Sequence, residues 1–171
     1  MIIAKRGDIT REDVDVIVNA ANEGLRGGGG VDGAIHRAAG SSVMEACRKI
    51  GHCATGDAVI TPAGKLKARR IIHTVGPVWN GGKSGEPGLL RDAYRTSFRL
   101  AKREGLRSIA FPAISTGVYG YPKKEAAMIA LAAGREFEED FDEIRFVCFS
   151  VGDLAIYKDI LNSNTGVGFQ P

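Results

Sequence analysis

The sequence predicts an α/β protein in which helices cover both faces of a central, mostly parallel sheet. Two observations lead to this prediction. Short β-rich runs alternate along the chain with segments of helical periodicity, and several of these runs are almost continuously apolar. Such strands are typical of sheets buried on both faces, and the alternation favours a layered α/β fold. The 171 residues are most economically one domain with a core of its own.

Six strands are predicted from runs of apolar and β-branched residues. In chain order they are MIIAKR (1–6), VDVIVNA (14–20), DAVITPA (57–63), RRIIHTVG (69–76), RSIAFPAI (107–114) and EIRFVCFS (143–150). Each run is short enough for a strand in a compact domain. The spacing between the runs leaves room for helical connections, which parallel pairing requires.

Helices are predicted where apolar residues recur at the helical period. Residues 31–40 indicate a short helix that ends at Gly40, because glycine commonly terminates helices. A second periodic segment covers 89–103. A third is expected to open at Pro122 and to reach Phe137, since proline is tolerated in a first helical turn.

The last helix is predicted over residues 152–161, with Asp153 near its positive N-terminal end. The final ten residues, NSNTGVGFQP, are rich in turn-forming types. We therefore expect a single domain over residues 1–161, followed by a frayed tail over 162–171.

Composition and charge argue against several classes of protein. The formal net charge is only +3 and no Lys/Arg-rich block occurs, so nucleic acid is not an expected partner. No run of 18 apolar residues occurs and the first residues do not have a signal-peptide layout, so we expect a cytoplasmic protein without a membrane partner. Cys47, Cys53 and Cys148 form no close pair, and His52 beside Cys53 lacks a second pair at ligand spacing. No metal site is predicted, and the thiols are expected to be reduced and buried.

Three glycine-bearing loops follow predicted strands: RGDIT (6–10), NEGLRGGGGVDG (22–33) and ISTGVYGYP (114–122). Ligands of open α/β sheets bind beyond the carboxyl ends of the strands, so these loops are expected to meet at one edge. Backbone N–H groups in a glycine loop beside a helix N-terminus form an anion site. Two facing loops of this kind suit a diphosphate.

Two motif matches in the sequence are misleading. Gly28, Gly30 and Gly33 satisfy G-x-G-x-x-G, but six residues separate the predicted strand end near Ala21 from the first of them. The dinucleotide fingerprint requires the turn directly after the strand, so a hydride-transfer enzyme is not predicted.

The second match is Lys83-Ser84, which resembles the end of a phosphate-binding P-loop, although Pro77 occupies the position of its first glycine. Gly85 and Pro87 are expected to prevent a helix from starting there, so residues 79–88 are predicted to form a surface loop rather than a nucleotide site. Trp79 in this loop either borders the pocket or fills the core.

Six blocks in order carry a family resemblance: GDIT, VDVIVNAAN, GGGGVDGAIHRAAG, TGDAVIT, IIHTVGP and FPAISTGVYGYP. From about Ile3 to Leu161 the chain resembles the macro domain family. The closest likeness is to the branch that hydrolyses O-acetyl-ADP-ribose and removes mono-ADP-ribose from proteins. The resemblance implies a three-layer α/β/α sandwich with a mixed, mostly parallel sheet. It also implies ADP-ribose, its O-acetyl ester and mono-ADP-ribosylated proteins as partners, and no cofactor.

The resemblance assigns residues to the two ends of the ligand. At the adenine end, Asp8 would accept a hydrogen bond from the amino group, the amide of Ile9 would read the same base, and Phe149 would stack on it. Without the resemblance, Asp8 is equally well explained as the cap of a turn through Thr10. The resemblance assigns the distal ribose and diphosphate to Asn22, to Gly27, Gly28, Gly29, Gly30 and Val31, and to Ser115, Thr116, Gly117, Val118 and Tyr119.

Asn22 and Asp32 are the residues to which the resemblance gives a catalytic role, with Asp32 orienting or activating water. The spacing of Asp32 alone favours a helix N-cap instead. His36, one turn further on, is expected to be structural, and Asn19 is expected to hold the backbone of its own loop. A chain with both Asn22 and Asp32 is predicted to be a hydrolase. The alternative is an ADP-ribose reader without turnover.

Overall fold

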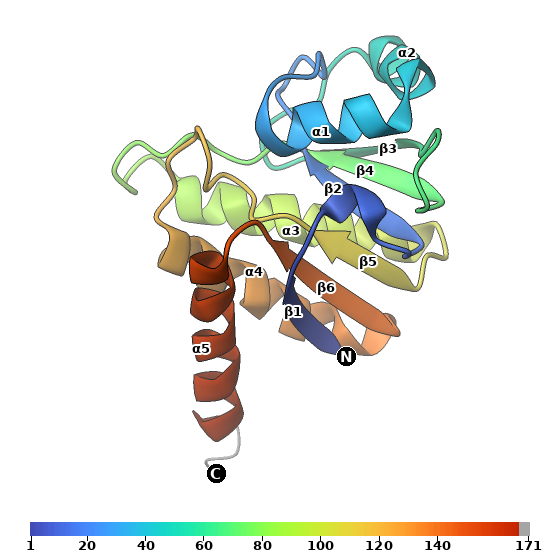
Figure 1. Cartoon of the computed structure of the whole chain (residues 1–171). Coiled ribbons are helices and arrows are strands. Elements are labelled where there is room, and N and C mark those ends of the chain that lie inside the picture. Colours follow the sequence, from blue (N-terminus) through green and yellow to red (C-terminus); the bar gives the residue numbers. More distant parts are fainter. Residues whose placement is uncertain (168–171) are drawn as a thin grey trace.

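The computed structural model describes residues 1–167, with side chains described up to residue 163. Its six strands form one sheet in the order β1-β6-β5-β2-β4-β3 (Figure 1). The strands are β1 (Ile2–Arg6), β2 (Val16–Ala20), β3 (Ala58–Pro62), β4 (Arg70–Thr74), β5 (Ser108–Phe111) and β6 (Glu143–Cys148). Neighbouring strands are parallel except β3, which runs antiparallel to β4. The predicted strands and the mixed, mostly parallel sheet are confirmed.

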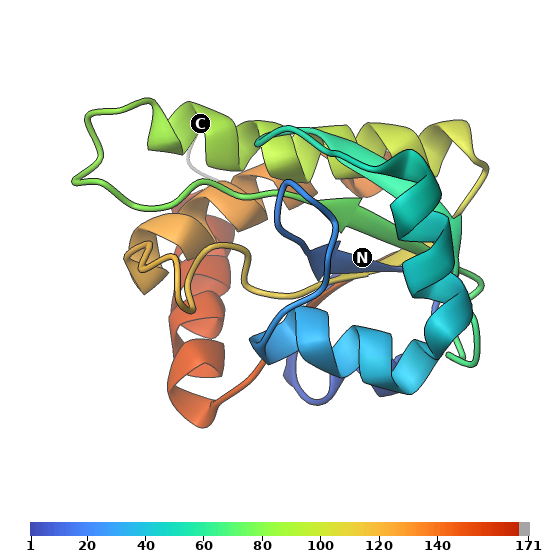
Figure 2. The same cartoon turned by 90° about the horizontal axis from the view of Figure 1, so that it is seen from above.

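Helices cover both faces of this sheet, as Figure 2 shows from above. They are α1 (Gly30–Ala39), α2 (Ser41–Ile50), α3 (Glu86–Arg103), α4 (Lys123–Phe137) and α5 (Val151–Val167), with 3-10 turns η1 (Ile9–Arg11) and η2 (Glu138–Asp140). The pair α1 and α2 lies on one face, and α3, α4 and α5 lie on the other. The three-layer α/β/α arrangement is the fold class that the sequence predicts.

Each face of the sheet has its own apolar core because successive strand residues point to opposite sides. Ile17 on β2 packs in the cluster that contains Ile35 of α1 and Val43 of α2. Its neighbour Val18 packs in the opposite cluster with Phe98 of α3. Burial on both faces explains why these strands are almost continuously apolar in sequence.

Two helix predictions need correction. Helix α2 was not predicted, because it follows α1 after the single residue Gly40 and buries little more than Val43 and Cys47, one turn apart. The expectation that Gly85 and Pro87 prevent a helix is wrong, since α3 begins at Glu86 with Pro87 in its first turn. Proline is tolerated there because a first-turn N–H has no helical partner in any case.

The last helix is longer than predicted. The expected domain boundary at residue 161 falls inside α5, which continues to Val167, so residues 162–167 are helical rather than turn-rich. Residues 168–171, the rest of the predicted tail, lie outside the described residues.

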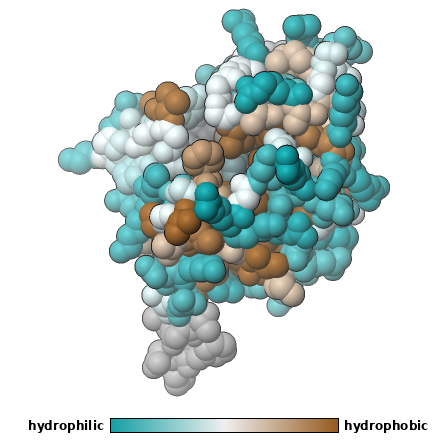
Figure 3. Space-filling model, in the orientation of Figure 1, coloured by the Kyte–Doolittle hydropathy of each residue, from teal (hydrophilic) through white to brown (hydrophobic). Residues whose placement is uncertain are grey.

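Over residues 1–167, no helix is both long and apolar enough to cross a membrane. The face in Figure 3 is largely hydrophilic, with apolar side chains gathered in small groups.

Candidate functional site

A cavity of about 370 Å³ lies where β2, β4 and β5 end. That size is typical of small-molecule sites. It is bordered by the loops after β2 and β5, so two of the three predicted glycine loops meet there, as expected. The predicted site residues in its lining are Asn22, Gly28, Gly29, Gly30, Val31, Asp32, Ser115, Gly117, Val118 and Tyr119. Six lining residues were not singled out from sequence: Ala20, Ala21, Gly76, Pro112, Ala113 and Ile114.

The first wall of the cavity is the glycine loop that leads into α1. The first N–H groups of α1, like those of any helix, have no partner inside the helix. The N-cap residue is Gly29, which has no side chain to bond them. Gly27 and Gly30 have φ values of +78° and +58°, which only glycine adopts readily. A Cβ on Gly33 would overlap the carbonyl of Gly28, so the loop packs directly on the helix. The backbone is thereby exposed to an anion at the positive end of α1.

The loop backbone is held by Asn22 and not, as expected, by Asn19. Asn22, which lines the cavity, holds the loop: its Nδ2 donates to the Gly27 carbonyl at 2.8 Å, and its Oδ1 accepts from the Arg26 amide at 3.0 Å. Asn19 is fully buried in β2, and its Nδ2 contacts the Asp32 carboxylate and the His73 ring instead. The prediction that Asn19 holds the loop backbone is wrong.

Asp32 does not cap α1, so the interpretation favoured by its spacing is also wrong. The N-cap is Gly29, and Asp32 lies in the first turn with only 6% of its surface exposed. Its Oδ1 accepts a hydrogen bond from Asn19 Nδ2 at 2.8 Å and lies 3.4 Å from His36 Nε2. Within the described part of the chain, its Oδ2 has no hydrogen-bond partner and lies beside Gly28 in the cavity wall. One carboxylate oxygen is thus held by protein, and the other is available to a ligand or water.

The second wall is the loop after β5. Ser115 has φ +68°, an uncommon conformation for a residue with a side chain, and its buried hydroxyl has no partner among the described residues. Gly76, at the end of β4, makes room for it, because a Cβ there would overlap Ser115 Oγ. Thr116 does not line the cavity; its hydroxyl donates to the Ala113 carbonyl at 3.0 Å and closes the turn.

Loop 79–88 supports this second wall from outside. Glu86 is 2% exposed, and its carboxylate accepts the amides of Asn80, Gly82 and Ser84 at 2.7, 2.9 and 2.6 Å. Burial raises the pKa of Glu86, but the amide of Glu86 itself and the three loop amides outweigh burial and lower it to about 2. Lys83 therefore lies on a loop whose backbone amides bind the carboxylate of Glu86.

Trp79 fills the core side of this loop rather than the cavity. It packs against the α3–α4 core, and its ring centroid lies 4.7 Å from that of Tyr121. Its amide donates to the Tyr119 carbonyl at 2.9 Å, which ties loop 79–88 to the cavity wall. Of the two alternatives left open by the sequence, the structure supports the one in which the Trp79 side chain fills the core.

The residues assigned to adenine lie outside the cavity lining but beside each other. Asp8 and Phe149 come just after Arg6 and Cys148, which are paired at the ends of β1 and β6. Phe149 is 89% exposed, whereas Ile9 is buried. Asp8 caps η1: the Thr10 hydroxyl and amide both donate to its Oδ1, and these bonds keep the pKa of Asp8 below its ordinary value. The carboxylate remains more than half exposed, so capping leaves it accessible.

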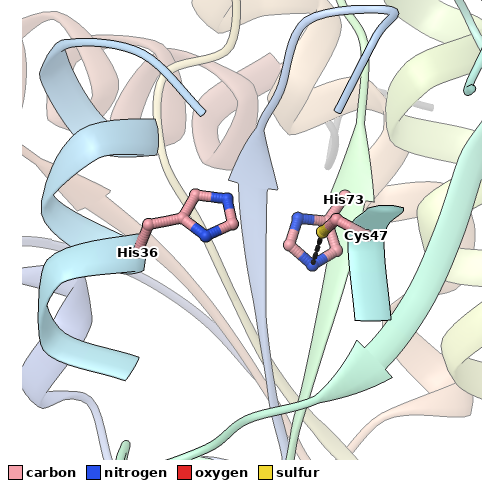
Figure 4. A group of neighbouring side chains, drawn as sticks. All are labelled: His36, Cys47 and His73. Carbon is pink, nitrogen blue, oxygen red and sulfur yellow. Dashed lines mark hydrogen bonds between the residues drawn. The ribbon is translucent and has the colours of Figure 1, made fainter. Parts of the chain in front are cut away.

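A cluster that sequence reasoning missed lies behind Asp32. His36, Cys47 and His73 come from α1, α2 and β4 and place potential ligand atoms within 4.8 Å of one another (Figure 4). Both nitrogens of His73 have hydrogen-bond partners, Asn19 at 3.1 Å and Thr61 at 2.9 Å, and burial raises the pKa of the Cys47 thiol to about 11. These features favour hydrogen bonding over coordination, which needs a free imidazole nitrogen and a thiolate. The other two cysteines are also free and buried, as expected.

Comparisons with known proteins agree with this architecture. Residues 18–130 match the family model described as Macro domain. A macro domain-containing protein of Ralstonia nicotianae is 58% identical over 93% of this chain and 93% of its own. A protein of Cronobacter sakazakii named O-acetyl-ADP-ribose deacetylase is 53% identical over 91% of each chain. The solved Trypanosoma brucei macrodomain in complex with ADP-ribose has a TM-score of 0.88 at 43% identity, covering 94% of this chain and 68% of the other.

Proposed function

This chain belongs to the macro domain family, and from that premise we propose that it binds ADP-ribose and hydrolyses O-acetyl-ADP-ribose to ADP-ribose and acetate. The observation that carries this proposal is the placement of Asp32. Its carboxylate is buried at the first turn of α1 and held through Oδ1, and no described residue forms a hydrogen bond to Oδ2 at the cavity wall. A binding site that only holds ADP-ribose needs the loops but has no need of an oriented carboxylate there.

The ligand would lie along the sheet edge with its adenine near Asp8 and Phe149. Its diphosphate would lie between the glycine loop of α1 and the loop over residues 115–119, where the unsatisfied amides of a helix N-terminus favour anions. The distal ribose would then reach Asn22 and Asp32. Neither loop contains a lysine, and Arg26 of the glycine loop is not part of the cavity lining, so backbone amides would meet most of the phosphate charge.

Asp32 would act on a water held between the distal ribose and the ligand phosphate. Its Oδ2 accepts a proton as the water oxygen attacks the acetyl carbonyl carbon. The bond from that carbon to the 2″ or 3″ oxygen then breaks, the ribose oxygen takes up the proton, and acetate leaves. Backbone N–H groups of the loops would stabilise the developing negative charge. The same arrangement would serve hydrolysis at C1″, releasing mono-ADP-ribose from aspartate or glutamate side chains of proteins.

The test is turnover of O-acetyl-ADP-ribose and of a carboxylate-linked mono-ADP-ribosylated protein, with ADP-ribose affinity measured in parallel. Asp32→Asn is expected to lower turnover about a hundredfold or more, because it removes a proton acceptor, while changing affinity little. Asp159→Asn, on the exposed side of α5, is the matched control and should behave like wild type.

Three outcomes would separate the alternatives. Binding without turnover in wild type would make the protein an ADP-ribose reader. Full turnover in Asp32→Asn would place the base elsewhere. Turnover of the acetyl ester alone would restrict the substrate to the small molecule and exclude modified proteins.

A further inference from the structure

Asp32 is the outer end of a line of buried polar side chains that crosses three strands. Asn19 of β2 donates to Asp32 at 2.8 Å and contacts Nδ1 of His73 on β4 at 3.1 Å. Nε2 of His73 lies 2.9 Å from the hydroxyl of Thr61 on β3. Asn19, His73 and Thr61 are each at most 1% exposed. Burying a polar group costs free energy unless the group is hydrogen-bonded, so a line of such groups in the core requires a structural or functional reason.

The direction of each hydrogen bond in this line follows from donor and acceptor chemistry. The Asn19 Nδ2 group can only donate, so Nδ1 of His73 accepts. A neutral imidazole then carries its proton on Nε2, which donates to the Thr61 hydroxyl. The Thr61 hydroxyl in turn donates a hydrogen bond to the Pro62 carbonyl at 3.0 Å. Burial supports the neutral form, because it lowers the pKa of His73 to about 3.

The orientation of the Asn19 amide is determined by the same argument. With both N–H groups used, one on Asp32 and one on His73, its Oδ1 is left buried without a partner in the described structure. Reversing the amide would direct that oxygen at the Asp32 carboxylate, oxygen against oxygen. Removal of the His73 acceptor would leave a second buried group unpaired and release the amide to turn.

We propose that His73 is a positioning residue for Asp32 and acts through Asn19. By accepting one N–H of the Asn19 amide, His73 holds the other N–H on Asp32 Oδ1, so that Oδ2 faces the cavity and the water. This inference rests on the proposed function, in which Asp32 orients that water. His73 itself touches no ligand, since it is not part of the cavity lining.

A matched pair of variants separates this role from a purely structural one. His73→Asn places an amide oxygen where Nδ1 accepts from Asn19 and loses the contact to Thr61. His73→Gln places an amide donor near Thr61 and loses the acceptor for Asn19. Both remove a buried ring and should lower the melting temperature to a similar extent.

The expected difference lies in turnover of O-acetyl-ADP-ribose. His73→Gln should lower kcat about tenfold or more with little change in ADP-ribose affinity, because a slightly misplaced catalytic group is costly. His73→Asn should retain most of the wild-type kcat. Equal losses of kcat in the two variants would overturn the proposal.

A second measurement does not depend on the variants folding. The ¹⁵N chemical shifts of the His73 ring in wild type report which nitrogen carries the proton. The Nε2–H tautomer is expected, and Nδ1–H would overturn the proposal. If wild type binds ADP-ribose without turnover, the proposed function is refuted, and the role of His73 in positioning Asp32 for catalysis is refuted with it. Active wild type with equal losses in both variants refutes the role of His73 alone.

Discussion

Asn19 and Asn22 show how strongly the position of a single residue decides its role. Asn19 is inside β2 and pairs in register with His73, so its side chain is directed into the protein, where it meets Asp32. Asn22 lies two residues beyond the end of β2, where the chain turns, and its amide closes that turn on Gly27. The same type of side chain therefore holds the Asp32 carboxylate when it lies within β2 and holds the glycine loop when it lies beyond the strand end.

Phe149 is a second residue whose role its surroundings suggest. A phenylalanine that is 89% exposed stabilises the fold little, so its replacement should leave the melting temperature unchanged. Phe149→Ala is expected to weaken ADP-ribose binding at least about fivefold, because base–aromatic stacking contributes about 1–3 kcal/mol. Isothermal titration calorimetry measures the change.

Val151→Ala provides the control for this prediction, since Val151 is nearby and 64% exposed but has no assigned contact. It should bind ADP-ribose like wild type. An unchanged affinity in Phe149→Ala would remove Phe149 from the adenine site.

At the scale of elements, loop 79–88 is organised by one carboxylate that belongs to the helix it precedes. Glu86 is the first residue of α3, and its carboxylate accepts hydrogen bonds from the amides of Asn80, Gly82 and Ser84. Through the Trp79 amide, the same loop holds the Tyr119 carbonyl in the cavity wall. The start of α3 thereby supports the second wall of the site.

Glu86→Gln should lower the melting temperature by several degrees near neutral pH, because an amide donor would oppose backbone donors. The folded pKa of about 2 is below the ordinary value of 4.5. The stabilisation is therefore fully present above pH 4.5 and is lost as pH falls towards 2. Thermal unfolding of both proteins over this range should show the difference shrinking with acid.

Glu45→Gln, on the exposed side of α2, controls for loss of an ordinary surface charge and should leave the melting temperature almost unchanged. Equal melting temperatures for wild type and Glu86→Gln at neutral pH would show that the three amides do not depend on the carboxylate. A lowered ADP-ribose affinity in Glu86→Gln would show that the loop supports the cavity wall.

At the scale of the whole molecule, the sheet separates two apolar cores, and the polar line from Asp32 to Thr61 runs over β2, β4 and β3 on the face that α1 and α2 cover. His73 lies in the middle of that line, fully buried between strands on both sides. Burial, with the neighbouring His36 adding to it, lowers the pKa of His73 from 6.5 to about 3. Full stability of the fold therefore requires this histidine to be neutral.

This requirement predicts loss of stability in mild acid. As pH falls below 6.5, the unfolded chain takes up a proton that folded His73 does not accept until about pH 3. The free energy of unfolding should fall by up to about 1.4 kcal/mol per pH unit in that range. Urea unfolding at several pH values above and below 6.5 measures this fall in the free energy of unfolding. The stabilisation by Glu86 does not interfere, because it is lost only below pH 4.5.

His73→Asn should flatten this pH dependence, whereas His52→Asn, at an exposed histidine, should not. A wild-type free energy of unfolding that stays constant between pH 6.5 and 4.5 would contradict the prediction.

The strands, four of the five helices of the described chain and the two glycine loops that form the cavity walls are predictable from sequence alone. These features follow from local patterns: apolar runs, helical periodicity and glycine-rich turns after parallel strands, whose carboxyl ends share one edge. The same patterns missed α2, which is short and joined to α1 by one residue. They also placed the start of α3 too late, because they weighed Pro87 as a breaker.

The side chains that hold Asp32 could not be predicted from sequence, because they are brought together by the packing of the sheet and helices. Asn19 and His73 are 54 positions apart in sequence, and His73 and Thr61 lie on strands that pair antiparallel. Spacing along the chain favoured a cap for Asp32 and a loop contact for Asn19, since local rules consider only neighbours in sequence. A buried hydrogen bond depends instead on which strands are adjacent and in which register, and that is settled when the sheet and helices pack together.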